Sequence, residues 1–198
     1  MKNKKLQAMI VVGMLSSISF VLMLFNFPLP ALPPFLKVDF SDIPALIAAI
    51  TMGPVAGILV AFFKNVLDWL FAGSPTGVPV GHMANLVTSI LFIMPVYIIY
   101  RKVASKKGII AGLVLGTLTM AIGMSVLNYF VFLPMYTYFL NVPAETGNAL
   151  FTTIVLGILP FNIIKGFILT AITLLMFNSI QPWIEKQRNY YRQKSRTV

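Results

Sequence analysis

Two polar side chains interrupt the last long apolar stretch of the sequence, and their types suit hydrogen bonding to a small molecule. Asn162 and Lys165 are three residues apart, so a helix would place them on one face. No acidic residue follows Lys165 before Glu185, which leaves the lysine without an evident partner on its own helix. We therefore interpret this pair as contacting a ligand, with Glu145 as a possible partner.

Other polar residues admit plainer interpretations. Lys64 and Asp68 are four residues apart, a spacing typical of ion pairs on one helix, and we predict that they neutralise each other. Asn128 suits a ligand contact and a hydrogen bond between helices equally well. His82 lies near the start of an apolar stretch, and we interpret it as a hydrogen-bonding group rather than a metal ligand.

Motifs for catalysis are missing. The segment GSPTGVPVG at 73–81 contains glycines but no Lys-Ser/Thr after them, so it does not predict a phosphate loop. Neither HExxH nor GxSxG occurs, and the chain has no cysteine. We predict that the protein is not an enzyme and has neither a cofactor nor a metal site.

The polar residues lie within a strongly apolar chain. Of 198 residues, 58% are hydrophobic and 10% are charged, with a mean hydropathy of +0.88. Apolar blocks occur at 6–27, 43–72, 83–100, 108–134 and 149–178. Each block is about 20 residues long or longer, which is enough to cross the hydrocarbon core of a bilayer. The sequence therefore predicts an all-α integral membrane protein in the cell membrane, with residues 1–198 forming a single transmembrane domain.

Charge decides the number of spans. Gly53 and Pro54 interrupt the block 43–72, and a proline ends or kinks a helix. Two helices, about 43–52 and 54–71, give six spans and put both basic tails and the 101–107 loop in the cytoplasm, as the positive-inside rule expects. The net charge of +10 is thus assigned to topology and anionic lipid headgroups rather than to nucleic acid. The basic residues considered are Lys2, Lys4, Lys5, Arg101, Lys102, Lys106, Lys107, Lys186, Arg188, Arg192, Lys194 and Arg196.

A proline-rich segment precedes the short helix 43–52. A ten-residue helix rises only about 15 Å, so it must be sheltered by protein. We expect the segment before it to be an outer loop that folds back over the bundle, with Ser41 or Asp42 capping the helix. Asp39 and Asp42 serve either this loop fold or ligand contact, and the sequence favours neither.

The predicted topology gathers the internal polar residues in the outer half of the membrane, which indicates an outward-facing pocket. Small residues also recur at a spacing of four, in the pairs Gly13/Ser17, Gly53/Gly57 and Gly112/Gly116. Such pairs allow close helix packing and make a partner membrane protein plausible.

The segments FLKVDFSDIPALI and MGPVAGILVAFFKN, followed by the late Asn162-Ile-Ile-Lys165, resemble the riboflavin-specific S component of energy-coupling factor (ECF) transporters. The resemblance covers nearly the whole chain. It implies a membrane subunit that captures riboflavin from outside and works with a transmembrane coupling subunit and two cytoplasmic ATPases. In S components, small residues of the first span contact the coupling subunit, often as AxxxA. Here Ala8 is followed by Val12, and Gly13 with Ser17 is the better match.

The resemblance also implies a binding site. Leu36, Val38 and Phe40 would contact the flavin ring. Asn128, Asn162 and Lys165 would bond its carbonyl and hydroxyl groups, with Glu145 near the mouth. Two alternatives stay open: an S component for another small vitamin, and an autonomous small-molecule facilitator or carrier.

Overall fold

The computed structural model describes the backbone of residues 2–195, without the side chains of residues 2–4, 178, 180 and 188–195. Five basic side chains of the predicted tails, those of Lys2, Lys4, Arg188, Arg192 and Lys194, therefore lie outside the described part, as does the whole of Arg196.

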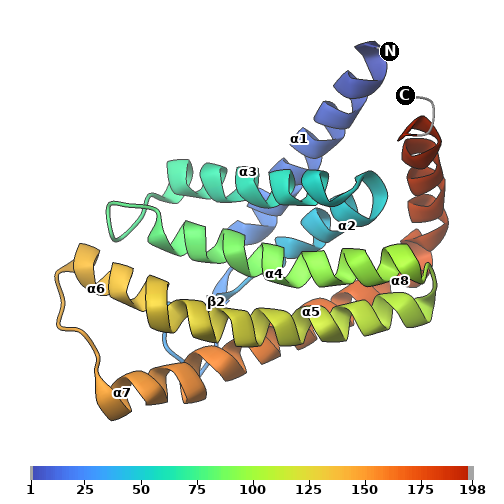
Figure 1. Ribbon diagram of the computed structural model, residues 1–198. Helices are drawn as coiled ribbons and strands as arrows, with labels where there is room; N and C mark the ends of the chain where they lie inside the picture. The colour runs from blue at the N-terminus through green and yellow to red at the C-terminus, as the bar shows by residue number, and fades with distance from the viewer. Residues whose placement is uncertain (1, 196–198) are drawn as a thin grey trace.

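The described chain is helical apart from short connections and one two-stranded ribbon (Figure 1). The elements are α1 Lys2–Leu24, β1 Phe27–Pro28, β2 Lys37–Val38, α2 Asp42–Met52, α3 Pro54–Ala72, α4 Val80–Lys102, α5 Lys106–Leu127, the π-helix η1 Asn128–Phe132, α6 Leu133–Leu140, α7 Gly147–Thr152, the π-helix η2 Thr153–Ile158, and α8 Leu159–Ser195.

Within the described residues, five helical segments are long and apolar enough to cross a membrane, and α2 is a shorter apolar helix. The five are Lys5–Leu24, Pro54–Ala72, Val80–Lys102, Lys106–Leu140 and Gly147–Phe177. The predicted all-α membrane class is confirmed. The start of α1 and the end of α8 lie at one end of the molecule, as an even number of crossings requires (Figure 1). Six crossings and cytoplasmic termini stay predictions.

The short helix α2 lies at the centre of the bundle. It contacts α1, α3, α4 and α8, and 9 of its 11 residues are buried. Gly53 ends it with φ +110°, a backbone conformation that favours glycine, and Pro54 starts α3. Gly57 then lets α3 approach closely, because a Cβ atom there would lie 2.6 Å from the Cβ of Ala49. The expected break and the expected shelter of the short helix are both confirmed.

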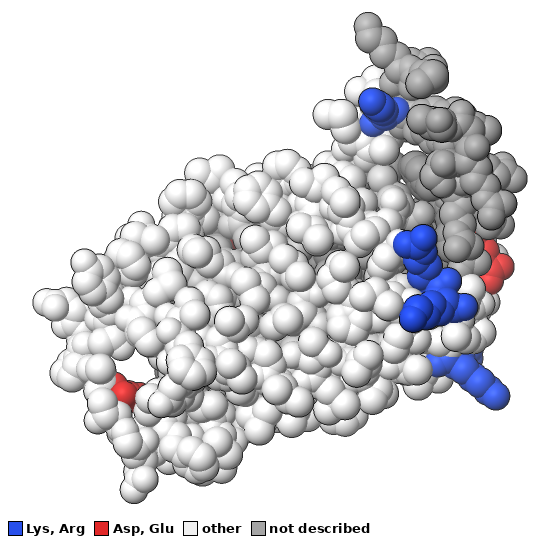
Figure 2. Space-filling model, in the orientation of Figure 1, with Lys and Arg blue, Asp and Glu red and all other residues white. Residues whose placement is uncertain are grey.

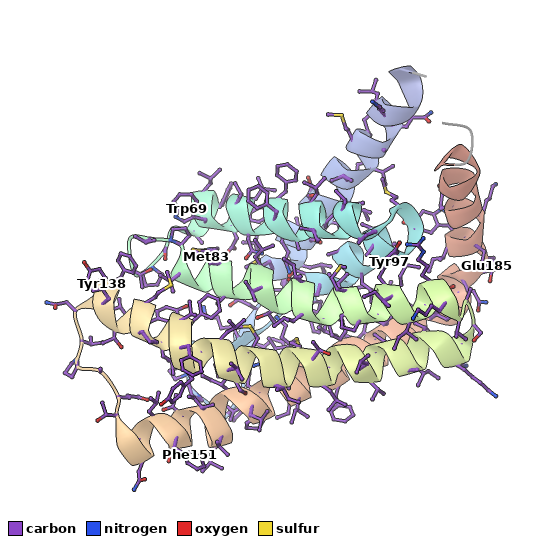
Figure 3. All side chains as sticks on the ribbon, in the orientation of Figure 1. Trp69, Met83, Tyr97, Tyr138, Phe151 and Glu185 are labelled. Carbon is purple, nitrogen blue, oxygen red and sulfur yellow. The ribbon has the colours of Figure 1, made fainter. Side chains whose placement is uncertain are left out.

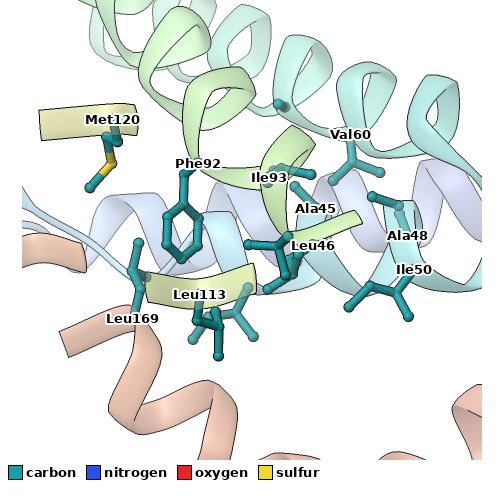
Figure 4. Packing of buried hydrophobic residues seen from close by; sticks show 14 of the residues in the cluster. Ala45, Leu46, Ala48, Ile50, Val60, Phe92, Ile93, Leu113, Met120 and Leu169 are labelled. Atoms are coloured by element: carbon teal, nitrogen blue, oxygen red, sulfur yellow. The ribbon is translucent and has the colours of Figure 1, made fainter. Parts of the chain in front are cut away.

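Apolar packing around α2 joins the other helices (Figure 4). Leu46 of α2, Phe92 of α4, Leu113 of α5 and Leu169 of α8 are each no more than 1% exposed and belong to one cluster. Burying a large aliphatic or aromatic side chain stabilises a fold in water by about 1.5–3 kcal/mol. Inside a bilayer that gain is smaller, because lipid tails are also apolar, so close fit matters more.

Two of the small-residue pairs pack within the chain. A Cβ atom at Gly112 would lie 2.9 Å from Cα of Val96, and one at Gly116 would lie 2.6 Å from the carbonyl oxygen of Phe92. These glycines allow α5 to pack closely on α4, and Gly57 does the same for α3 on α2. The Cβ position of Gly13 has no other atom within 4 Å, and Ser17 is exposed. Among the three pairs, Gly13/Ser17 is the one left with an open face.

The two ends of the bundle differ in charge. We call the end with the α4–α5 connection the basic end, since Arg101, Lys102, Lys106 and Lys107 are all exposed there. On the visible face, Lys and Arg gather at that end (Figure 2). The opposite end carries the 73–79 and 141–146 connections and is called the loop end (Figure 1).

Candidate functional site

Four charged side chains meet in the interior of the bundle. Lys64 Nζ of α3 lies 2.6 Å from Asp42 Oδ1, at the start of α2. Lys165 Nζ of α8 lies 3.2 Å from Asp39 Oδ2 and 3.5 Å from Asp42 Oδ2. None of these four side chains is more than 3% exposed. Two ammonium groups and two carboxylates therefore form one buried, electrically balanced cluster, which we call the charge cluster.

Serine hydroxyls complete the charge cluster. Ser41 Oγ accepts a hydrogen bond of 2.6 Å from Lys64 Nζ and donates one to Asp39 Oδ1. The backbone N–H of Ser41 donates to the same oxygen at 2.9 Å. Ser89 of α4 donates to Asp42 Oδ1, and Ser19 of α1 donates to the Ser41 carbonyl at 2.9 Å. Hydrogen bonds from α1, α3, α4 and α8 thus converge on residues 39–42.

The balance of charge decides whether such a cluster is tolerable. Removing an ion from water costs several kcal/mol, and pairing offsets this only where geometry and hydrogen bonds are good. Burial alone raises the pKa of the Asp39 carboxyl, but the ammonium groups of Lys165 and Lys64 outweigh it and hold this pKa below its ordinary 3.8. Asp39 is therefore ionised at neutral pH. Its contribution to stability is lost only as the pH falls below that ordinary value.

Two predicted pairings are wrong. Lys64 does not pair with Asp68; it pairs with Asp42, and Asp68 Oδ2 instead lies 3.0 Å from His82 Nε2. Lys165 does not pair with Glu145, whose Oε2 accepts a hydrogen bond of 2.6 Å from Thr153. Spacing along one helix reveals local partners only, and the carboxylates that reached both lysines come from residues 22 and 126 positions away.

His82 is a hydrogen-bonding group in the structure, as interpreted from the sequence. Its ring and the Asp68 side chain are each 13% exposed, and they join α3 to α4 near the loop end. Across the part of the chain that the structure describes, no group of three or more His, Cys, Asp or Glu side chains could hold a metal ion.

The two predicted asparagines lie beside π-helical turns. Asn128 starts η1, and its Nδ2 donates to Met124 O at 2.8 Å. Asn162 follows η2, and its Nδ2 donates to Ile158 O at 2.8 Å. Both side chains are buried, with 5% and 3% exposed. Single π-turns inside α-helices occur frequently at functional sites, because they reorient side chains and free backbone groups.

The loop between α1 and α2 folds back onto the bundle, as expected. Strands β1 and β2 pair antiparallel, with Phe27 opposite Val38. The rings of Phe35 and Tyr136 of α6 are 6.2 Å apart between centroids. Pro33 lies against Gly157 of η2, where a Cβ atom would be 3.1 Å from its Cγ. The loop therefore contacts α6 and η2, the elements next to η1 with Asn128 and α8 with Asn162.

This loop carries the predicted site residues Leu36, Val38 and Phe40, and it is joined to α8, which carries Asn162 and Lys165. Val38 is fully buried, whereas Leu36 and Phe40 are half-buried. Residue 39, between them, reaches Lys165, one turn beyond Asn162. Glu145 stands apart in the exposed connection at the loop end.

Sequence reasoning missed Ser89 and left Asp42 undecided. Asp42 is the shared carboxylate of the charge cluster, so pairing, one of the two roles left open for it, is observed. One feature of the sequence pointed to Asp42: an acidic residue stands at the start of a helix that is too short to cross a membrane. Ser89 gave no signal, since serine is common inside membrane helices.

Side chains at the two ends suit a membrane boundary. Trp69, Met83, Tyr138 and Phe151 lie toward the loop end, and Tyr97 with Glu185 lies toward the basic end (Figure 3). Tyrosine and tryptophan are enriched at membrane–water interfaces, where an apolar ring body and a polar tip are both accommodated.

Comparison with known proteins now defines the family. Residues 7–177 match the model of the family described as the ECF transporter, substrate-specific component. The chain belongs to this family. It is therefore a multi-pass membrane protein of a transport system and not an enzyme.

Relatives cover nearly the full length of this ECF substrate-specific component. It is 53% identical over 189 residues to the riboflavin transporter FmnP of Bacillus subtilis (strain 168), covering 96% of this chain and 98% of the relative. It is 44% identical to the riboflavin transporter RibU of Staphylococcus aureus (strain TCH60), covering 93% and 94%. A solved structure described as the S component of a bacterial ECF transporter superposes with a TM-score of 0.77 at 40% identity, over 93% of this chain and 99% of that one.

The charge cluster predicts unequal effects for two aspartates. Asp42→Asn leaves Lys64 without a carboxylate. We expect the free energy of unfolding to fall by about 3–5 kcal/mol, which is typical of a broken buried ion pair. Asp68→Asn removes a partly exposed contact and should cost no more than about 1 kcal/mol. Thermal unfolding of both variants in the same detergent measures the difference. Equal midpoints would contradict the central role of Asp42.

Proposed function

We propose that this ECF substrate-specific component binds riboflavin at the loop end and delivers it inward with an ATPase-driven coupling module. The observation that carries the proposal is 53% identity to a protein named a riboflavin transporter, over almost the whole of both chains. The similarity extends over 189 of the 198 residues and is not confined to one part of the chain. Residues 1–198 would act as one substrate-binding unit.

Riboflavin matches the chemistry gathered around the loop. The flavin ring is flat and largely apolar, with carbonyl oxygens and ring nitrogens at its edge, and the ribityl chain carries hydroxyls. A site for it needs apolar walls and a few well-placed polar groups. Leu36, Val38 and Phe40 would supply apolar contact.

Polar contacts would come from the helical segments that face the loop. Asn128, Asn162 and Lys165 would hydrogen bond the ring carbonyls and ribityl hydroxyls, and Glu145 would lie near the mouth. Lys165 has three N–H donors, so it can bond a ligand while it stays paired with Asp39 and Asp42. This combines the ligand contact expected for Lys165 with the ion pairs it makes.

Topology sets the direction of capture. With the basic end in the cytoplasm, as the positive-inside rule requires, the loop end faces outward with the loop and its asparagines. Six crossings with both termini inside give this orientation.

The partners follow from the family. A transmembrane coupling subunit and two cytoplasmic ATPases would drive transport, and the open face at Gly13 and Ser17 of α1 would contact the coupling subunit. An autonomous carrier is the main alternative, and a component for another vitamin is the second.

The absorption spectrum of the purified protein tests whether riboflavin is the ligand. The chain purified in detergent from cells grown with riboflavin should show a flavin absorption spectrum at close to one flavin per protein. A colourless protein that also leaves the fluorescence of added riboflavin unquenched would overturn the assignment and favour another vitamin.

Riboflavin uptake by reconstituted liposomes tests whether transport requires the coupling subunit and ATPases. Liposomes that contain this chain alone should take up no more riboflavin than empty ones, whereas liposomes that also contain the coupling subunit and ATPases should take it up when ATP is inside. Uptake by the chain alone would favour the autonomous carrier.

Substitution at Lys165 tests its contact with the ligand. Lys165→Arg keeps the charge and donors, so its riboflavin Kd should rise little. Lys165→Ala removes a charged donor and should raise the Kd roughly 10- to 100-fold. Quenching of riboflavin fluorescence measures both, after thermal unfolding has shown that each variant folds. Equal and undiminished binding in the two variants would remove Lys165 from the site.

A further inference from the structure

The loop between α1 and α2 is buried only near its C-terminal end. From Leu24 to Lys37 no side chain is fully buried, and the first that are belong to Val38 and Asp39. Residues 25–40 are also held by the two-residue ribbon, by the ring contact of Phe35 with Tyr136 and by the contact of Pro33 with η2. Asp39 Oδ1 accepts hydrogen bonds from Ser41, which is bonded in turn to Ser19 and Lys64. In the described structure, the pair of Asp39 with Lys165 is the ion pair that joins residues 25–40 to the helices.

The two carboxylates of the charge cluster belong to different structural elements. Asp42 is the first residue of α2, a helix enclosed by four others. Asp39 precedes that helix and belongs to the loop. If the loop lifted as far as residue 40, Asp39 would leave the charge cluster and Asp42 would stay.

Lys165 can lose one carboxylate without becoming unpaired. Its Nζ lies 3.2 Å from Asp39 Oδ2 and 3.5 Å from Asp42 Oδ2, so it keeps a carboxylate partner after Asp39 departs. Asp42 then faces both ammonium groups, and the charge cluster carries one net positive charge. Asp39 would move into water, where a carboxylate is well solvated. Contact with Asp42 reduces the penalty for leaving Lys165 buried, and the remaining excess positive charge favours the closed position of the loop. Lys64 has no such second carboxylate in the described structure: its Nζ pairs with Asp42 and also donates to the Ser41 hydroxyl.

We propose that the Asp39–Lys165 ion pair is a latch that holds residues 25–40 closed against α8, and that Asp42 keeps Lys165 paired while the latch is open. Asp39 is then a positioning residue for substrate: it acts on the bound molecule through the loop and not by contact. This proposal rests on the proposed function, which places riboflavin between the loop and the asparagines.

The latch has a kinetic consequence. A molecule enclosed by the loop leaves only when the latch opens, so weakening the latch raises the dissociation rate constant. The association rate constant changes less, because a loop that opens more often admits substrate at least as readily. A residue that merely stabilised the whole fold would not divide its effect in this way.

Hydrogen exchange of the full chain in detergent, without riboflavin, tests the latch directly. In Asp39→Asn, amides of the loop such as Leu36 N–H, which donates to Pro33 O at 2.9 Å, should exchange about tenfold faster. Amides of α3 and α4 should keep their rates. Lys37→Gln is the matched control, because it removes a charge from the same loop at an exposed position without touching the charge cluster.

Stopped-flow quenching of riboflavin fluorescence supplies the second measurement. Asp39→Asn should release riboflavin about tenfold faster and bind it at a rate within about threefold of the wild type. Asp39→Glu retains a carboxylate and should restore most of the slow release.

Three results would overturn the latch: unchanged loop exchange in Asp39→Asn, faster exchange spread equally over α2, α3 and α4, or failure of this variant to fold. The last would show that Asp39 is required for folding and is not releasable. The exchange measurement needs no flavin. Its outcome decides the latch even if the wild-type chain binds no riboflavin, which would overturn the proposed function alone.

Discussion

The charge balance of four buried side chains constrains the arrangement of this protein's centre. Two lysines and two aspartates meet where water is excluded, and an unpaired member would carry a penalty of several kcal/mol. Each member belongs to a different support: Asp39 to the loop, Asp42 to α2, Lys64 to α3 and Lys165 to α8. Pairing therefore fixes how these elements meet. Apolar packing alone does this poorly in a bilayer, because lipid tails solvate leucine as well as another helix does.

The shortness of α2 follows from the same constraint. A full-length span beginning at residue 42 would carry Asp42 to the membrane surface, away from both lysines. Gly53 ends α2 after 11 residues, and its first residue, Asp42, lies in the interior. The irregular backbone this creates is tolerated because α1, α3, α4 and α8 enclose it.

How far the sequence predicts this structure depends on the range of the interaction. Features set by neighbouring residues were predictable: the apolar spans by their length, the break at Gly53-Pro54 by proline chemistry, and the return of the loop by its prolines. Pairings set by the tertiary fold were not. Lys64 and Asp68 have ideal spacing for an ion pair, yet Lys64 reaches Asp42, because α2 packs against the face of α3 that carries the lysine. The glycines of α5 likewise showed a close contact without showing that α4 would make it.

In the candidate site, Lys165 alone shows this contrast between local features, which the sequence predicts, and tertiary pairings, which it does not. Lys165 was recognisable as unusual because its helix offers no acid before Glu185, and that argument singled it out correctly. The inference that it therefore awaits a ligand did not follow, because an aspartate 126 residues earlier supplies a charge. A buried lysine with two carboxylates can do more than one with none. It can hold a loop through the first, keep contact with the second, and still present a donor to a bound molecule. Binding and closure can thus be joined at a single ammonium group, which links the chemistry of the site to the movement that a transport subunit requires.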